Sequence, residues 1–348
     1  MHSKTRITMD RQDATTAVAA TAIGAVLSTE TSAAADTNEE ASNMDYDAIV
    51  VGGGPSGLSA ALVLGRSCRK VLVCDAGQPR NRTSPAVHSF FSRDGIRPAE
   101  LLKIGREQLK PYDVSFHDGR VTSAQRSNPG FRVQTESGET FLARNLILAT
   151  GVKDDLPELE GLADLWGTGV YHCPYCHGWE VRKKPWAYMA DAGLAVEWGL
   201  ELQCWAGELT YCSGGTSELT DADREKLREL GIEIREQSIK RILSESNGIR
   251  GIEFTDGESL DVEAFFIRAP VVPRSSLAKQ LGCKLVSMTG VYSDTAETDQ
   301  FGATSVPGVY VVGDASVGAP QVTTAVTDGA MAATMINKSL VKDGVPSR

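Results

Sequence analysis

Continuous apolar runs, each followed by small residues or turns, mark out the predicted elements of this chain. Residues 46–51 form such a run and predict a buried strand, and residues 58–64 predict a helix after a glycine-rich turn. Residues 70–75 predict a second strand that ends in an acid, Asp75. Strand, glycine turn, helix and strand in this order are typical of a βαβ nucleotide-binding unit.

The glycine-rich turn carries the first candidate binding residues. Its glycines follow the GxGxxG spacing: the first permits a tight turn, the second lets a pyrophosphate approach the backbone, and the third brings helix against strand. The helix N-terminus then faces the phosphates. Asp75 stands where a ribose hydroxyl would need an acceptor. The turn residues expected to hold a dinucleotide are Gly52, Gly54, Pro55, Ser56 and Gly57.

Two later apolar runs complete the predicted nucleotide domain. Residues 145–151 predict a buried strand that ends in the small-residue turn Ala149, Thr150 and Gly151. Residues 307–315 predict another strand, with Gly313 and Asp314 at its carboxyl end. An ordinary βαβ turn without a ligand is the alternative, and the full set of elements argues against it.

Cys173 and Cys176 form the one close cysteine pair, in the segment His-Cys-Pro-Tyr-Cys-His. Two thiols at this spacing can close a readily reduced disulfide, and imidazoles beside them can stabilise a thiolate. His172 and His177 are therefore candidates, with histidines satisfied by nearby backbone as the alternative. Half of a zinc site or two unrelated core cysteines would also fit the pair. A structural zinc site would need a second CxxC or CxxH, and since the sequence has none, we expect no metal.

The length, composition and net charge of the chain limit the number of domains and the kinds of partner that we expect. With 348 residues, 41% of them hydrophobic, the chain can form two domains of ordinary size. Its formal net charge of -10 and the lack of a basic run argue against nucleic acid as a partner, and favour small molecules or proteins. Beyond the N-terminal segment no eighteen consecutive residues are apolar, so no membrane span is expected.

The first 44 residues differ in kind from the rest. Basic residues precede the weakly apolar run 14–27, and the small residues 32–36 fit a cleavage site, which together predict an export signal. The alternative is an Ala/Thr-rich extension, or translation that starts at Met9 or Met44, on a cytoplasmic protein. Both exported and cytoplasmic locations therefore stay open.

Taken together, residues 45–338 resemble the thioredoxin reductase family of FAD-dependent disulfide oxidoreductases, class II of the pyridine nucleotide-disulfide oxidoreductases. The resemblance implies an α/β fold with two Rossmann-like three-layer domains, the FAD domain being split by a smaller nested one, and a homodimer. The expected ranges are a leader at 1–44, the FAD domain at 45–155 and 292–341, the nested domain with CPYC at 156–291, and a tail at 342–348.

The resemblance also implies roles for single residues. Cys176 would lie against the flavin as the charge-transfer thiol, and Cys173 would exchange with the substrate sulfur. The glycine turn and Asp314 would hold FAD, with Asp314 bonding a hydroxyl of the flavin side chain. Segment 319–325, including Gln321 and Val322, would begin the helix beneath the flavin ring. His177 replaces the acid that ordinary thioredoxin reductases have after the second cysteine, and can still relay a proton.

The nested domain departs from the family pattern at the NADPH site. After the predicted strand 186–189, Ala190 and Ala192 stand where the family has phosphate-binding glycines, and Asp191 adds a negative charge. The arginines that bind the 2′-phosphate are missing after the strand 209–212. NAD(P)H is therefore expected to bind poorly.

The sequence thus predicts an FAD-dependent dithiol/disulfide oxidoreductase that uses Cys173 and Cys176. In one hypothesis a ferredoxin-type donor reduces the flavin, which then reduces a disulfide in a thioredoxin-like protein. In a second, a small dithiol is oxidised and O₂ or a quinone takes the electrons. A conventional NADPH-dependent thioredoxin reductase and a non-catalytic flavin-binding protein are the remaining alternatives.

Overall fold

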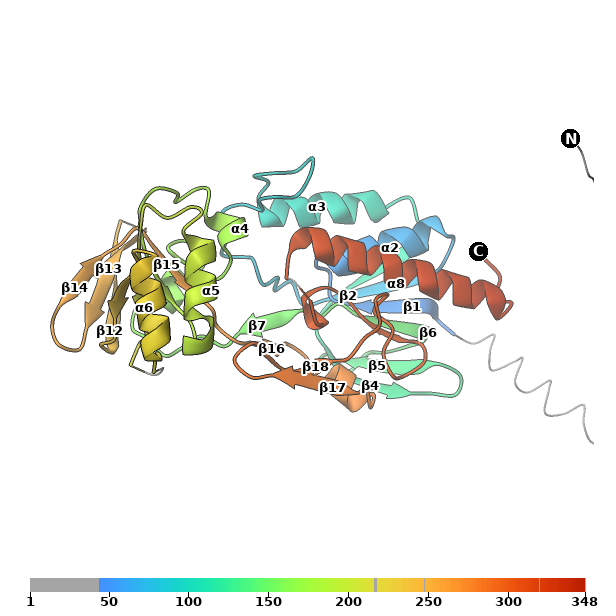
Figure 1. Cartoon of the computed structure of the whole chain (residues 1–348). Helices are drawn as coiled ribbons and strands as arrows, with labels where there is room; N and C mark the ends of the chain where they lie inside the picture. The colour runs from blue at the N-terminus through green and yellow to red at the C-terminus, as the bar shows by residue number, and fades with distance from the viewer. Residues whose placement is uncertain (1–43, 216–217, 247, 319, 348) are drawn as a thin grey trace, which may run out of the picture. The chain divides into compact units, whose positions relative to one another are not determined.

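The computed structural model describes residues 44–215, 218–246, 248–318 and 320–347 (Figure 1). The predicted leader, apart from Met44, and Ala319 lie outside this range. Among the described residues no helix is both long enough and apolar enough to cross a membrane.

The first sheet carries the predicted nucleotide unit. Its strands have the order β3-β2-β1-β6-β5-β4, and β19 pairs with β6. The strands β1, β2, β3, β6 and β19 run parallel, whereas β4 and β5 form an antiparallel meander with β6. The bounds are β1 Tyr46–Val51, β2 Val71–Asp75, β3 Val114–Asp118, β4 Val121–Arg126, β5 Phe131–Thr135, β6 Thr140–Leu148 and β19 Val309–Val311.

Helices cover one face of this sheet, as Figure 1 shows for α2 (Pro55–Arg66), α3 (Pro98–Leu109) and α8 (Val322–Lys342). Small residues let α2 and α8 cross closely: a Cβ on Gly329 of α8 would overlap the carbonyl oxygen of Ser56 in α2. Buried leucines, isoleucines and alanines of both helices pack on β1 and β2. The opposite face packs against the β4–β5 meander and the helix α7 (Leu277–Gln280).

Register brings the carboxyl ends of the central strands level. Val51 pairs with both Cys74 and Leu148, and Leu148 also pairs with Val311. The turns that follow these strands must therefore meet at one edge of the sheet, which is where parallel α/β sheets bind ligands.

A second, all-parallel sheet carries the order β11-β10-β9-β15-β8. Aromatic residues of its strands form a separate core with α5 and α6. A three-stranded meander, β12-β13-β14, belongs to the same part of the chain. The bounds are β8 Val170–Tyr171, α4 Pro174–His177, β9 Pro185–Met189, α5 Ala192–Leu202, β10 Glu208–Cys212, α6 Asp221–Glu229, β11 Glu233–Arg235, β12 Ile239–Glu245, β13 Gly248–Phe254, β14 Ser259–Asp261 and β15 Ala264–Ile267.

A small sheet links the two parts where the chain passes between them. β7 (Val152–Asp154) leaves the first sheet and pairs antiparallel with the returning β16 (Val271–Pro273). The strands β17 (Leu285–Met288) and β18 (Tyr292–Ala296) complete it. The α/β class and the parallel sheets confirm the predicted fold class, while the limits of the predicted domains stay predictions.

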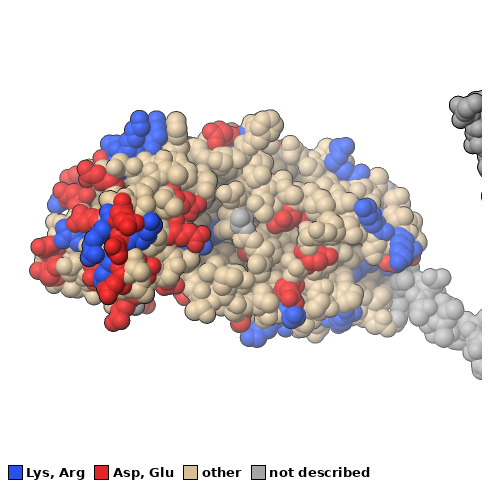
Figure 2. Space-filling view, viewed as in Figure 1, with Lys and Arg blue, Asp and Glu red and all other residues tan. Residues whose placement is uncertain are grey.

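The charges that give the chain its acidity are mixed on the face seen in Figure 2. Over α6, acidic and basic side chains alternate and form ion pairs, including Lys226 with Glu229 and Arg224 with Glu236. The net charge of -10 is therefore not gathered over this helix.

Candidate active site

A cavity of about 960 Å³ opens at the carboxyl ends of β1, β2 and β6 and reaches the cysteine pair. Most of the predicted site residues line it. Gly57, Gly313 and Cys173 are not among the residues that line it. The predicted residues in the wall are Gly52, Gly54, Pro55, Ser56, Asp75, Ala149, Thr150, Gly151, Asp314, Gln321, Val322, Cys176 and His177.

The glycine turn has the geometry that a pyrophosphate requires. Gly52 has a φ of 112°, and a Cβ there would overlap the Ala149 carbonyl oxygen. A Cβ on Gly57 would overlap the Gly52 carbonyl oxygen, whereas one on Gly54 would meet nothing within 4 Å. The first turn of α2 has no side-chain cap, so its free N–H groups remain available to an anion. The turn therefore fits the phosphates of FAD.

Asp75 already has a cationic partner, which the sequence did not predict. Arg106 of α3 donates to Asp75 Oδ2 at 2.6 Å, and the Gly77 N–H donates to Oδ1 at 3.1 Å. The Arg106 guanidinium also lies 4.6 Å from the centre of the Phe116 ring. Asp75 is thus fixed at the cavity wall, where a ribose hydroxyl could reach it.

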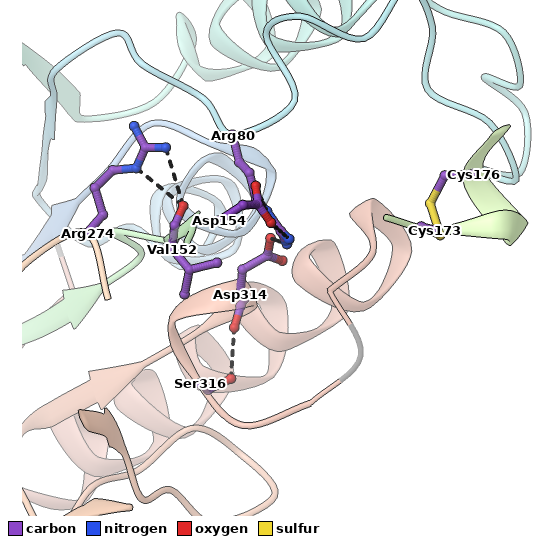
Figure 3. Close-up of polar contacts among 9 residues, drawn as sticks. Arg80, Val152, Asp154, Cys173, Cys176, Arg274, Asp314 and Ser316 are labelled. Carbon is purple, nitrogen blue, oxygen red and sulfur yellow. Dashed lines mark hydrogen bonds and ion pairs between the residues drawn. A yellow bond between two sulfur atoms is a disulfide. The ribbon is translucent and has the colours of Figure 1, made fainter. Parts of the chain in front are cut away.

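Asp314 lies in a short 3₁₀ turn, Gly313–Ala315, rather than in the strand predicted for residues 307–315. The strand ends earlier because the left-handed φ of 66° at Gly313 turns the chain. Arg80 Nη1 donates to Asp314 Oδ2 at 3.0 Å (Figure 3). Gln321 and Val322 line the same cavity, as the N-cap and first residue of α8.

Arg80 also binds a second carboxylate, that of Asp154 in β7. Its Nε donates to Asp154 Oδ2 at 3.2 Å, and its Nη2 donates to Oδ1. Burial alone would raise the pKa of Asp154, but hydrogen bonding and charge from Arg80 hold the pKa below its usual value. The sequence analysis missed both residues, because neither belongs to a recognisable motif.

Cys173 and Cys176 are joined by a disulfide, with their Cα atoms 5.3 Å apart. Cys173 caps the short helix α4, and Pro174 occupies its first position. Of the two cysteines, Cys176 faces the cavity. Figure 3 shows the disulfide at one end of the site that Arg80 and Asp314 also occupy.

His177 is held between two neighbours of the cavity wall. Its ring stacks on Tyr171 with centroids 4.6 Å apart, and its Nε2 lies 3.1 Å from Ser84 Oγ. Nδ1 is buried and has no hydrogen-bond partner among the described residues. Burial, and then the charge of His88, lower the pKa of His177 to about 4, although the Cys173 carbonyl opposes this shift. The imidazole is therefore neutral near pH 7.

His172 is the second histidine beside the disulfide. Its ring stacks on Trp166 with centroids 5.9 Å apart. Burial and the nearby Arg80 charge lower its pKa to about 4, although the Asp154 carboxylate opposes this. His172 is therefore also neutral near pH 7.

The region expected to bind nicotinamide nucleotides carries an acidic side chain at the start of α5. Asp191 is the N-cap residue of α5, and a Cβ on Gly290 would overlap its carboxylate oxygen. Ala190 is buried, and its carbonyl accepts a hydrogen bond from Tyr211 at 3.0 Å. Arg235, level with Cys212 at the end of β10, forms ion pairs with Glu233 and Glu258.

Comparison with known proteins identifies the family. The model of the pyridine nucleotide-disulphide oxidoreductase family matches residues 46–329. Thioredoxin reductase sirT of Leptosphaeria maculans is 31% identical over 84% of this chain and 93% of its own length. Thioredoxin reductase tcpT of Claviceps purpurea is 30% identical over 85% of this chain and 95% of its own.

Solved structures support the same family assignment. The crystal structure of an oxidoreductase from Agrobacterium tumefaciens matches with a TM-score of 0.81 and 34% identity, covering 86% of this chain and 99% of that one. The crystal structure of HlmI matches with a TM-score of 0.80 and 35% identity, covering 86% and 93%. The chain therefore belongs to the pyridine nucleotide-disulphide oxidoreductase family and is an FAD-dependent oxidoreductase of the thioredoxin reductase-like type.

Proposed function

We propose that the chain performs dithiol/disulfide exchange through Cys173 and Cys176, with FAD as its cofactor and with little use of NAD(P)H. The observation that carries this proposal is the disulfide at one end of the cofactor cavity, in which Cys176 lines the cavity and Cys173 does not. That arrangement suits Cys176 as the thiol on the flavin side and Cys173 as the thiol that meets the substrate.

The residues that would hold FAD follow from the cavity wall. The turn Gly52–Gly57 and the start of α2 suit the pyrophosphate, Asp75 suits a ribose hydroxyl, and Asp314 suits a hydroxyl of the flavin side chain. When bound, FAD supplies a two-electron store between the cysteine pair and a second electron donor or acceptor.

In the oxidising direction, a substrate thiolate attacks Cys173 Sγ, the Cys173–Cys176 bond breaks, and Cys176 leaves as a thiolate. The second substrate thiol loses its proton and attacks the substrate sulfur of the mixed disulfide. The substrate leaves as a disulfide and Cys173 as a thiolate. Two electrons have then passed to the cysteine pair.

His177 lies beside the disulfide and could move a proton in either direction of the exchange. Burial keeps its imidazole neutral near pH 7, so it could accept the proton of an attacking thiol, although a pKa of about 4 makes it a weak base. As an imidazolium it could return that proton to a leaving thiolate. The acid that the family usually has here would be a proton donor when protonated.

The substrate would meet exposed aromatic side chains beside the disulfide. Tyr175 lies between the two cysteines, Trp179 follows them, and Phe91 belongs to the loop that contacts Tyr175 through Ser89. Exposed aromatic rings are typical of contact surfaces. They suit either a small apolar dithiol or a thioredoxin-like protein, the partner implied by the names of the relatives.

The first prediction assigns the two thiols. Cys173→Ser should leave a Cys176 thiolate that gives long-wavelength charge-transfer absorbance, because Cys176 faces the cavity. Cys176→Ser should lack the band. Absorption spectra of the purified yellow proteins under argon measure this, with Cys68→Ser, an exposed free cysteine, as the matched control. A band in Cys176→Ser alone would reverse the roles.

The second prediction concerns His177. His177→Gln should slow dithiol-driven bleaching of the flavin by about a hundredfold, the lower end of what a general base contributes, because a base with a pKa of about 4 is weak at neutral pH. The ratio of wild-type to variant rates should be equal at pH 6 and pH 8, because a pKa of about 4 leaves the imidazole neutral at both. His117→Gln, on β3, is the control. A ratio that falls between pH 8 and pH 6 would indicate an ordinary histidine pKa and contradict the assignment.

The third prediction concerns the nicotinamide nucleotides. The expected 2′-phosphate arginines are missing, and losing two charge-assisted hydrogen bonds of about 1.5–3 kcal/mol each weakens binding by roughly a hundredfold or more. Asp191 would also repel a phosphate at the start of α5. NADPH and NADH should bleach the flavin very slowly, whereas dithiothreitol should bleach it readily. Complete bleaching by either nucleotide within seconds in a stopped-flow experiment would contradict this prediction. It would favour a conventional NADPH-dependent thioredoxin reductase.

A further inference from the structure

Arg80 is a cation of the cofactor cavity that binds two carboxylates. It follows β2 in a loop, its side chain is 14% exposed, and it contacts two carboxylates from distant parts of the chain. Asp154 comes from the linking strand β7 and Asp314 from the turn after β19. All three residues line the cavity, and Figure 3 shows the two carboxylates meeting at one guanidinium.

The carboxylates around Arg80 require a cation at this position. Two carboxylates share one guanidinium, and His172 beside them cannot compensate because its imidazole is neutral near pH 7. A third carboxylate, Asp328 of α8, lies close enough that burial and the Asp314 charge raise its pKa. Without Arg80, Asp314 would face two carboxylates with no cation among its contacts, and its side chain would be pushed out of position.

Arg80 can orient Asp314 by bonding to only one of its two carboxylate oxygens. The guanidinium engages only Oδ2 of Asp314, and no described residue bonds to Oδ1. The same guanidinium holds Asp154 with two parallel bonds, which a lysine could not reproduce. One oxygen of Asp314 therefore stays available to the cavity while the other is held.

The loop that carries Arg80 is itself fastened to β7. Arg274, after β16, donates to the Gln78 carbonyl at 3.0 Å and to the Val152 carbonyl at 3.3 and 3.4 Å. Figure 3 shows Arg274 and Val152 beside the Arg80 cluster. Arg80 thus projects from a backbone that is tied to the strand carrying its partner Asp154.

We propose that Arg80 is a positioning residue for FAD binding: it holds Asp314 by one oxygen, braced against Asp154, so that the other oxygen can accept a hydroxyl of the cofactor. Arg80 acts on the cofactor through Asp314. Asp154 serves as the brace and does not bind the cofactor.

The test is the rate at which holoprotein releases FAD, followed by the rise in flavin fluorescence after dilution. Arg80→Gln should speed release by about tenfold or more, since it removes a charge-assisted contact. The release rate of Arg80→Lys should lie between those of Arg80→Gln and the wild type, because lysine keeps the charge but loses the paired bonds. Arg132→Gln, an exposed arginine of β5, should match the wild type.

A double-mutant cycle with Asp314→Asn separates positioning from direct binding. If Arg80 acts through Asp314, Arg80→Gln should change release by less than about twofold in the Asp314→Asn background. Equal acceleration in both backgrounds would show that Arg80 does not act through Asp314 and would overturn the proposal. Release from Arg80→Gln at the wild-type rate would also overturn it. Should Arg80→Gln not fold, Arg80→Lys replaces it in the same cycle.

Discussion

The close contact between the Gly52 backbone and the Ala149 carbonyl governs where this molecule can bind a cofactor. β1 and β6 end level with each other, and the chain after β1 must turn in the space left by Ala149, the residue that follows β6. Only a residue without Cβ fits, and the positive φ of Gly52 then directs the following backbone into α2. The free N–H groups of α2, the fixed Asp75 and the Arg80 cluster all face the cavity that this turn opens.

Electrostatics then divides the cavity into two regions. Near the strand ends, charged pairs dominate: Arg106 with Asp75, and Arg80 with Asp154 and Asp314. Near the disulfide, burial keeps His172 and His177 uncharged at neutral pH. A charged region suits the polar tail of a dinucleotide, whereas a neutral base beside a thiol pair suits proton transfer during exchange.

Much of the fold could be predicted because it depends on local patterns. Continuous apolar runs predicted β1, β2, β9 and β10 to within a residue, and the glycine spacing predicted the turn at 52–57. The strand predicted at 145–151 is β6, which begins five residues earlier, at Thr140, and ends at Leu148. The cavity brings together the predicted turns because parallel strands share one carboxyl edge. Asp314 was assigned to a strand, since an apolar run does not reveal where a glycine ends it.

Arg80, Asp154 and Arg106 could not be predicted in the same way. Each owes its role to contacts across 31 to 234 residues of sequence, and loop arginines follow no period. The neutral state of His177 likewise depends on burial by Tyr171 and Ser84, which only the folded chain brings together. Sequence pattern predicts which elements form, while charge pairing between loops requires the structure.

The central claim is that the Cys173–Cys176 pair exchanges electrons with FAD, and an anaerobic titration with dithiothreitol tests it most directly. If electrons pass between the cysteine pair and the flavin, full bleaching requires about two equivalents of dithiol per FAD, one for the disulfide and one for the flavin. Readmitted air should then restore the yellow colour. Bleaching of the wild type that is complete at about one equivalent, or a flavin that dithiols never bleach, would contradict the account.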